Sequence, residues 1–314
     1  MSRGESRADA HPRPEAPFMN PPGGSRGPVS ASLLAIVAMA AWGSAYVPSA
    51  WLVESWPPLL AAAARIGIGG LILLAVLRLL GRPVMPGAEW GVVLVLALTQ
   101  SVIFYGATFI GIAEEGAGTA AVLANTDPLF VAALAAVFLG ERLGPRQWAG
   151  LVVGLVGAAA VVWQGPLWPP SISWISLLVV LGALGWAVGT VAVTGRIRAG
   201  ARPVAIAGWQ MLIGGAMLAA LGALLGGAPS TTGGREIGLI LLVALVGNAI
   251  PFALFYVALG RGAAGKVSAW FFLVPVVGVL SAWPLLGEVP GPRLWAGLVL
   301  VCVGLWMVLA PSRR

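Results

Sequence analysis

Long apolar stretches separated by short polar breaks run along the sequence from residue 29 to residue 310. A helix needs roughly 20 residues to cross about 30 Å of hydrocarbon, and ten of the stretches have about this length. Gly and Pro, which favour turns, punctuate the breaks. The pattern therefore predicts ten transmembrane helices, at residues 30–52, 58–80, 90–112, 117–140, 146–163, 173–194, 204–225, 237–259, 265–286 and 293–310.

The composition also favours a lipid environment. Hydrophobic residues make up 59% of the 314 residues and charged residues only 9%, whereas a soluble domain carries about 25% charged residues. Residues 1–28 differ, because they mix Pro, Gly, Ser and Arg without periodicity, and we predict a disordered tail there. The predicted fold class is an all-α integral membrane protein, with the lipid bilayer as its surroundings.

Several kinds of chemistry lack the residues they need. The one histidine, His11, lies in the tail, and the one cysteine, Cys302, lies in an apolar stretch. This argues against zinc sites, intrachain disulfides and histidine-dependent catalysis. No phosphate-binding Gly-x-x-x-x-Gly-Lys-Ser/Thr segment occurs, and the net charge of +7 is not gathered into a basic stripe. We predict no enzymatic activity, no cofactor, no metal and no nucleic-acid partner.

The basic residues separate by side of the membrane. With ten spans, fifteen of the eighteen Lys and Arg residues fall in the two termini and the even-numbered loops. Only Arg235 and Arg293 fall on the other side, and Arg65 lies within a helix. Because positive loops stay inside, we predict that both termini are cytoplasmic and that the chain lies in the cytoplasmic (inner) membrane.

The two halves of the sequence repeat each other. Residues 140–152 (GERLGPRQWAGLV) and 287–299 (GEVPGPRLWAGLV) are identical at ten of thirteen positions. This predicts a duplication with units at 29–164 and 171–310, each of five helices. An odd number of helices makes the second unit enter the membrane from the opposite side. Inverted repeats are typical of secondary transporters, whose binding sites lie near the bilayer midplane between the halves.

The repeat extends over most of the two units. The register of the identical segment, with small shifts farther upstream, aligns these pairs: Pro128 with Pro275, Ser101 with Asn248, Tyr105 with Phe252, Trp42 with Trp186, and Arg65-x-x-x-Gly69-Gly70 with Gln210-x-x-x-Gly214-Gly215.

A set of short motifs in this order resembles a known family. The motifs are Trp42-Gly43-Ser44, Arg65, Asp127-Pro128 ahead of Leu139-Gly140-Glu141-Arg142-Leu143, and Pro275 ahead of Leu286-Gly287-Glu288. Their spacing and duplication resemble the paired EamA-type domains of the drug/metabolite transporter superfamily over about residues 30–310. The resemblance implies ten helices, cytoplasmic termini and a central cavity lined mainly by the third, fourth, eighth and ninth helices. It also implies export of amino acids, related metabolites or drugs.

Asp127 is the sharpest candidate for a functional side chain. It lies near the middle of its predicted helix, where a carboxylate costs roughly 2.5–3.5 kcal/mol to insert. Pro128 lacks a backbone N–H and weakens the helix locally. We predict a substrate- or proton-binding carboxylate, with an ion pair to Arg65 as the structural alternative. Members of the family often have Glu at this position, so Asp127 is a departure from their pattern.

Arg65 and a group of polar and aromatic residues are further candidates. Arg65 either contacts an anionic group of the substrate, snorkels to the external interface or ties helices together. Amides beside aromatic rings suit a pocket for zwitterionic or aromatic metabolites, although amides also join transmembrane helices. The remaining candidates for cavity lining are Gln100, Ser101, Tyr105, Asn125, Asn248, Tyr256, Trp42, Trp186 and Trp270.

Glu141 and Glu288 are predicted to be structural. Each follows a helix and precedes a Gly-Pro turn with an Arg five positions on, Arg146 or Arg293. Gly ends one helix and Pro starts the next, so the acid–Arg pair is expected to pin the hairpin.

The function predicted is secondary, ATP-independent transport of a small molecule, with export of amino acids or related metabolites first and protons as a coupling partner. Efflux of cationic drugs and a receptor without flux are the alternatives. An intramembrane enzyme is disfavoured, because an aspartyl protease needs two carboxylates in the membrane and only Asp127 is central. The oligomeric state is left open.

Overall fold

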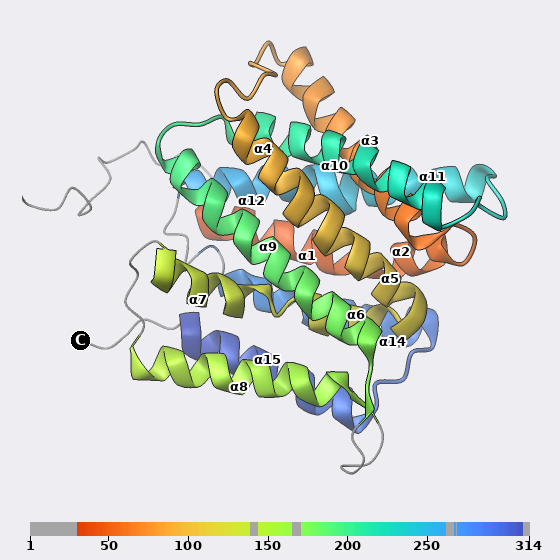
Figure 1. Ribbon diagram of the computed structural model, residues 1–314, viewed down its shortest axis with the longest axis vertical. Helices are drawn as coiled ribbons and strands as arrows, with labels where there is room; N and C mark the ends of the chain where they lie inside the picture. Colours follow the sequence, from red (N-terminus) through yellow and green to blue (C-terminus); the bar gives the residue numbers. More distant parts are fainter. Residues whose placement is uncertain (1–29, 139–143, 165–170, 262–266, 268, 310–314) are drawn as a thin grey trace, which may run out of the picture.

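A computed structural model describes residues 30–138, 144–164, 171–261, 267 and 269–309. The predicted tail at 1–28 and Glu141 lie outside these residues. The described chain is helical apart from one pair of two-residue strands, β1 with β2 (Figure 1). Its elements are α1 (Ala31–Ser44), α2 (Tyr46–Val53), α3 (Pro58–Leu79), α4 (Trp90–Leu96), η1 (Ala97–Tyr105), α5 (Gly106–Glu115), α6 (Ala117–Ala124), α7 (Asp127–Phe138), α8 (Pro145–Val162), β1 (Trp163–Gln164), β2 (Ser171–Ile172), α9 (Trp174–Arg198), α10 (Pro203–Leu225), α11 (Gly234–Ala244), η2 (Leu245–Ala249), α12 (Ile250–Arg261), η3 (Ala269–Phe272), α14 (Leu273–Leu286) and α15 (Pro292–Leu309).

Each of the ten predicted helical ranges overlaps a helix in the part of the chain that the structure describes. Within the described residues, seven helical stretches are long and apolar enough to cross a membrane, and α14 and α15 contain shorter apolar helices. Many large hydrophobic side chains, such as Leu79, Leu224 and Val137, remain exposed on the outside of the bundle. An outer surface of this kind is stable against lipid tails and unstable in water.

Several predicted helices are interrupted near their middles. The first breaks at Ala45, between α1 and α2, and the fourth breaks at Asn125–Thr126, between α6 and α7. The third and eighth each contain a π-helical stretch, η1 and η2. π-Helical segments frequently mark functional sites, and irregular backbone is tolerated at membrane depth only where protein or a cavity covers it. The interruptions therefore direct attention to the interior between the two halves.

Helices that correspond in the sequence repeat pack against each other. Between α3 and α10, a Cβ atom on Gly70 would lie 2.7 Å from the backbone nitrogen of Leu212. A Cβ atom on Gly215 would likewise lie 2.7 Å from the backbone nitrogen of Gly67. In the repeat register Gly70 corresponds to Gly215 and Gly67 to Leu212, so the two contacts exchange when the halves are exchanged. This reciprocity is the property of an interface on a twofold axis.

The pair α8 and α15, side by side in the lower part of Figure 1, behaves in the same way. A Cβ atom on Gly157 would lie 2.8 Å from the nitrogen of Val301, and one on Gly304 would lie 2.5 Å from the nitrogen of Gly154. The repeat register again exchanges these two contacts. Glycine at these positions lets the helix backbones touch.

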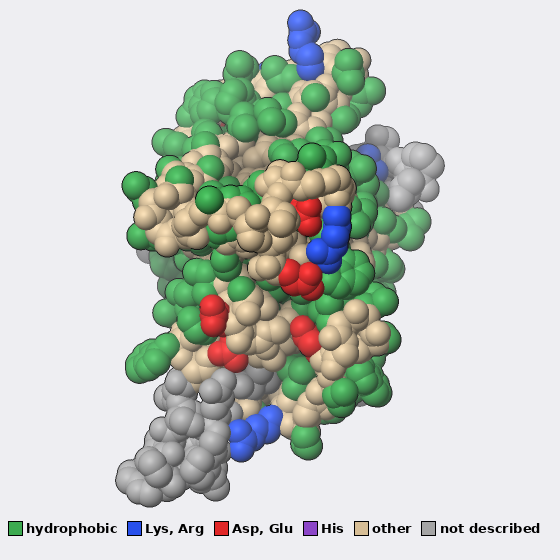
Figure 2. Space-filling model, turned by 90° about the vertical axis from the view of Figure 1, so that its right-hand side faces the viewer, with side chains coloured by type: hydrophobic (Ala, Val, Ile, Leu, Met, Phe, Trp, Pro, Cys, Tyr) green, Lys and Arg blue, Asp and Glu red, His purple; other side chains and the backbone are tan. Residues whose placement is uncertain are grey.

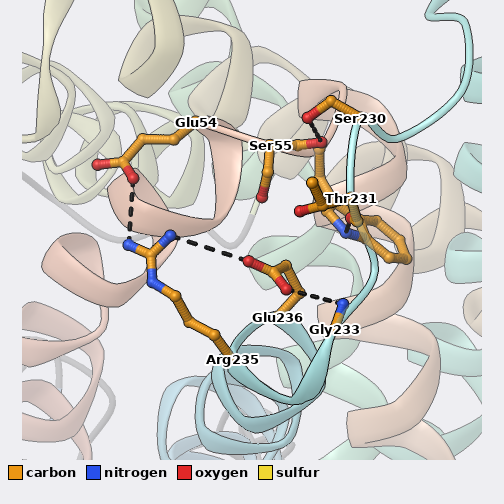
Figure 3. Close-up of polar contacts among 8 residues, drawn as sticks. Glu54, Ser55, Ser230, Thr231, Gly233, Arg235 and Glu236 are labelled. Carbon is orange, nitrogen blue, oxygen red and sulfur yellow. Dashed lines mark hydrogen bonds and ion pairs between the residues drawn. The ribbon is translucent and has the colours of Figure 1, made fainter.

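Loops on one face of the molecule tie the two halves together. Figure 2 shows acidic side chains gathered on this face, where the ends of α2, α5, α11 and α14 meet. Figure 3 shows Arg235 of the second half between Glu54 of the first half, at 3.1 Å, and Glu236. Nearby, the backbone N–H of Ser230 donates to the carbonyl oxygen of Ser55 at 2.9 Å.

Candidate functional site

A cavity lies between the two halves, close to the interrupted helices. Its volume is about 30 Å³, enough for about two water molecules. Six lining residues come from the first half and three from the second. They are Trp42, Tyr46, Arg65, Tyr105, Thr108, Asn125, Trp186, Phe271 and Val274. We refer to this space as the Arg65 cavity; a metabolite enters it only if the surrounding helices move apart.

Arg65 is the charged member of the lining. It lies on α3 and only 4% of the residue is exposed. Its Nη1 donates to Ser49 Oγ at 3.1 Å and its Nη2 donates to the carbonyl oxygen of Gly247 at 2.7 Å, while Nε donates to Asn248 Oδ1. The rings of Tyr105 and Phe109 lie 5.0 and 5.6 Å from the guanidinium carbon. The charge is therefore held by neutral acceptors and aromatic faces.

Two of the sequence-based interpretations of Arg65 are wrong. Snorkelling to the interface is excluded, because the side chain is buried and bonds across to η2 of the second half. The ion pair with Asp127 is absent as well: the salt bridges recorded within the described chain join Arg196 to Glu89 and Arg235 to Glu54 and Glu236. Arg65 does join helices, as one of the interpretations predicted. Because it also lies in the cavity wall, it is placed to contact a ligand as well.

Aromatic rings of both halves form part of the wall of the Arg65 cavity. Trp42 contacts Trp186 edge-on, with ring centroids 5.7 Å apart, and stacks on Phe271 at 5.9 Å. Tyr105 packs 6.3 Å from Trp186. The Nε1–H of Trp186 is buried and has no hydrogen-bond partner among the described residues. A buried donor without a partner is rare and calls for a ligand, a water molecule or strain.

Asp127 is buried, at 2% exposed, yet it does not line the Arg65 cavity. It starts α7, and its neighbour Pro128 occupies the first turn of that helix. The predicted helix breaks at Asn125–Thr126, just before Pro128, and a proline in a first turn sacrifices no hydrogen bond. The local weakening of the helix by Pro128 stays a prediction. The positive end of α7 stabilises the carboxylate.

Three predicted amides and hydroxyls lie outside the lining and join helices instead. Tyr256 donates its hydroxyl to Gln100 Oε1 at 3.0 Å, and Gln100 Nε2 donates to Thr190 Oγ1 at 3.2 Å. Ser101 Oγ donates to Gln210 Oε1 at 2.9 Å. These contacts support the structural alternative for Gln100, Ser101 and Tyr256.

Of the predicted binding residues, the structure places Trp42, Arg65, Tyr105, Asn125 and Trp186 in the wall of the Arg65 cavity. Asn248 does not line the cavity but accepts a hydrogen bond from Arg65. Trp270 does not line it either, although its neighbour Phe271 does.

Sequence reasoning missed four lining residues: Tyr46, Thr108, Phe271 and Val274. Helical spacing from predicted residues could have found two of them, since Tyr46 follows Trp42 by four positions and Thr108 follows Tyr105 by three.

The residues predicted to be structural have other contacts than expected. Glu288 accepts hydrogen bonds from the backbone N–H groups of Ala117 and Gly118, both at 2.8 Å, and so caps α6 of the other half. Arg146 lies over the ring of Trp306 at 4.3 Å. Pro275 occupies the first turn of α14, matching Pro128 in α7. The pairing of Glu288 with Arg293 stays a prediction, and its counterpart Glu141 lies outside the described residues.

The apolar spans and the buried polar centre define a multi-pass membrane protein. Residues 29–163 and 173–310 each match the family described as "EamA-like transporter family". The chain belongs to this family and is a membrane transporter, as the resemblance of its motifs predicted.

Several curated proteins are similar over most of the chain. An uncharacterized inner membrane transporter of Escherichia coli is 29% identical and covers 85% of this chain and 86% of its own. A probable amino-acid metabolite efflux pump of Salmonella typhimurium is 27% identical, with 87% and 93% covered. A riboflavin transporter of Rhizobium johnstonii is 32% identical, with 61% and 64% covered.

A solved crystal structure of a protein 21% identical in sequence has the same fold. The superposition gives a TM-score of 0.66 and covers 88% of this chain and 95% of the other.

Proposed function

We propose that this protein exports small metabolites that carry a carboxylate group, amino acids or related compounds, by alternating access of two five-helix halves. The observation that carries the proposal is the Arg65 cavity. Residues of both halves line it, and it holds a buried guanidinium that has no carboxylate partner among the described residues. Removing one partner of a buried ion pair costs about 3–5 kcal/mol, so a site of this kind favours an anionic group from the substrate.

The reciprocal glycine contacts support an inverted repeat of units 29–164 and 171–310, with ten helices in all. If two five-helix units are related by a twofold axis, corresponding helices face each other and their contacts exchange. Both α3 with α10 and α8 with α15 do so. A rocking motion of one half against the other then exposes the Arg65 cavity to each side in turn.

The small volume of the Arg65 cavity and the closed loop face support a state in which the site is shut off from that face. Arg235 and Glu54 join the halves there, and so does Glu288 at the start of α6. We place both termini in the cytoplasm and the protein in the cytoplasmic membrane. The scarcity of basic residues on this face supports the orientation, and the relative from Escherichia coli is named an inner membrane transporter.

For Asp127 we propose a role in proton coupling. It is one of few carboxylates buried in the described chain and lies two residues after Asn125 of the cavity wall. Asp127→Asn keeps the size and the helix start but cannot exchange a proton. We expect the variant to fold and to lose the pH dependence of transport in proteoliposomes, with Asp127→Glu as the matched control. Transport that follows pH as in the wild type would exclude this role.

Export itself is tested by a metabolite profile of cells with and without overexpression, repeated with Asp127→Asn. Accumulation of a carboxylate-bearing metabolite outside the overexpressing cells is expected. The Arg65 cavity disfavours cationic drugs, because a second cation beside Arg65 is repelled. Ligand binding without flux in proteoliposomes would favour a receptor, and hydrolysis of a reporter peptide by purified protein would favour an enzyme.

A further inference from the structure

The chemistry of the Arg65 cavity restricts the charge of its ligand. Its nine lining residues include one cation, Arg65, and no carboxylate. The other polar lining groups are phenol hydroxyls, indole N–H groups, one amide and one threonine hydroxyl, all neutral. A ligand that neutralises Arg65 brings one negative charge, and the wall holds no acid to match an ammonium group.

Free donors in the wall point to an oxygen-rich group. A guanidinium has five N–H groups, and three of them serve Ser49, Gly247 and Asn248. Each terminal nitrogen therefore keeps one N–H outside these three bonds, and Arg65 also has a side-chain hydrogen bond with Tyr105, which leaves about one N–H of the guanidinium for a ligand. The buried Nε1–H of Trp186 is unpartnered among the described residues. Two oxygens of a carboxylate satisfy such a set of donors.

The remaining wall is apolar and aromatic. Trp42, Trp186 and Phe271 contact one another with centroids 5.7 to 6.5 Å apart, and all three line the cavity. A planar or branched hydrophobic body can replace these ring contacts when the helices separate. A hydrophilic body would leave its polar groups without partners there.

We infer that the site prefers a monocarboxylate with an aromatic or branched apolar body, such as a 2-oxo or arylalkanoic acid, over the zwitterionic amino acid of the same shape. This rests on the proposed function and narrows it. An ammonium group on the ligand meets neutral oxygens and aromatic faces but no carboxylate in the wall, within a small space that already contains the Arg65 charge. Asp127 is buried outside the lining, although it lies near enough to the wall residues Tyr46 and Tyr105 to interact with them electrostatically.

The test compares three compounds with the same phenyl ring and different charge. Radiolabelled 3-phenylpropionate is bound to the purified full-length protein in detergent micelles and competed with unlabelled 3-phenylpropionate, phenylalanine or phenethylamine. We expect phenylalanine, whose ammonium group is repelled by the Arg65 charge, to compete at least about 10-fold more weakly than 3-phenylpropionate. Phenethylamine should compete least, because it also lacks the carboxylate, and each charged hydrogen bond contributes about 1.5–3 kcal/mol.

Arg65→Gln introduces the residue that the second half has at the corresponding position, and should weaken 3-phenylpropionate binding by about 10- to 100-fold. Arg78→Gln, on the exposed end of the same helix, removes an equal charge and should leave binding unchanged. The thermal unfolding midpoint of both variants separates loss of binding from loss of fold.

Equal competition by phenylalanine, or absence of 3-phenylpropionate binding, overturns the inference. Measurement of flux in proteoliposomes distinguishes failure of this inference from failure of the proposed function. If amino acids are transported and acids without an ammonium group are not, the proposed export function is supported and the inferred preference for monocarboxylates is wrong. If no carboxylate-bearing compound from a cell extract crosses the membrane, the proposed function fails.

Discussion

The two halves of this transporter share a packing skeleton and differ in their polar centres. Arg65 of the first half donates to Asn248 of the second, and Ser101 of the first donates to Gln210 of the second. In the repeat register Arg65 corresponds to Gln210 and Asn248 to Ser101, so the two hydrogen bonds are counterparts. The hydrogen bond between the halves occurs at both corresponding positions, but only the one made by Arg65 includes a charged side chain. The two halves thus share a hydrogen bond at corresponding positions, and the half with Arg65 supplies the charge of the cavity.

A similar contrast holds for the fourth helix of each unit. In the first unit this helix breaks between α6 and α7, just before Pro128. In the second unit the 3₁₀ segment η3 precedes α14, and Pro275 lies in the first turn of α14. The residue before that proline is Asp127 in the first unit and Val274 in the second. The same backbone pattern therefore forms with an acid before the proline in one unit and without one in the other.

The largest expected effect comes from charging the neutral centre. Gln210 is fully buried, and Gln210→Arg would bury a second cation with no acidic neighbour among the contacts described for it. We expect unfolding to become easier by about 3–5 kcal/mol, measured as thermal unfolding in detergent micelles. Gln210→Met, which removes one hydrogen bond and adds no charge, should cost about 1 kcal/mol. Equal stability of the Arg variant and the wild type would show that the two centres are interchangeable.

The next effect tests the shared skeleton. Gly70→Ala and Gly215→Ala each place a methyl group 2.7 Å or less from backbone atoms of the facing helix. We expect each to destabilise the protein by about 1–3 kcal/mol, because the helices must move apart. In the control Gly195→Ala, the added Cβ meets nothing within 4 Å, and a gain of up to about 1 kcal/mol in helix propensity is expected. Very different costs at Gly70 and Gly215 would argue against the twofold relation.

The smallest effect concerns the contacts that join the halves at the loop face. Glu288→Gln removes the charge that caps α6 and should cost about 1 kcal/mol. Glu54→Gln breaks a pair in which both side chains are 56% exposed, and such pairs contribute about 0–1 kcal/mol. The same thermal measurement should rank Glu288→Gln below Glu54→Gln in stability. The reverse order would show that the exposed pair, and not the helix cap, holds the face together.

Much of the architecture was predictable, because apolar length and repeated motifs are local properties of the chain. The ten helical ranges and the alignment of the two copies came from such patterns. The candidate site was predictable only in part. Gln100 and Trp186 looked equivalent in sequence, as polar or aromatic residues inside apolar helices, yet Trp186 lines the cavity and Gln100 bonds to Tyr256 and Thr190. Which face of a helix meets a cavity depends on how neighbouring helices rotate and break.

The sequence by itself determined that this chain is embedded in lipid and that it is duplicated. It also determined that a few polar side chains must be buried away from lipid, because an unsatisfied polar group in hydrocarbon costs several kcal/mol. The tertiary structure decided how the sheltering is done. It separated Arg65 from Asp127, gave the guanidinium neutral partners on the opposite half and set it in the cavity wall. Those partners lie about 180 residues away along the chain, and contacts over such separations arise only when whole helices pack.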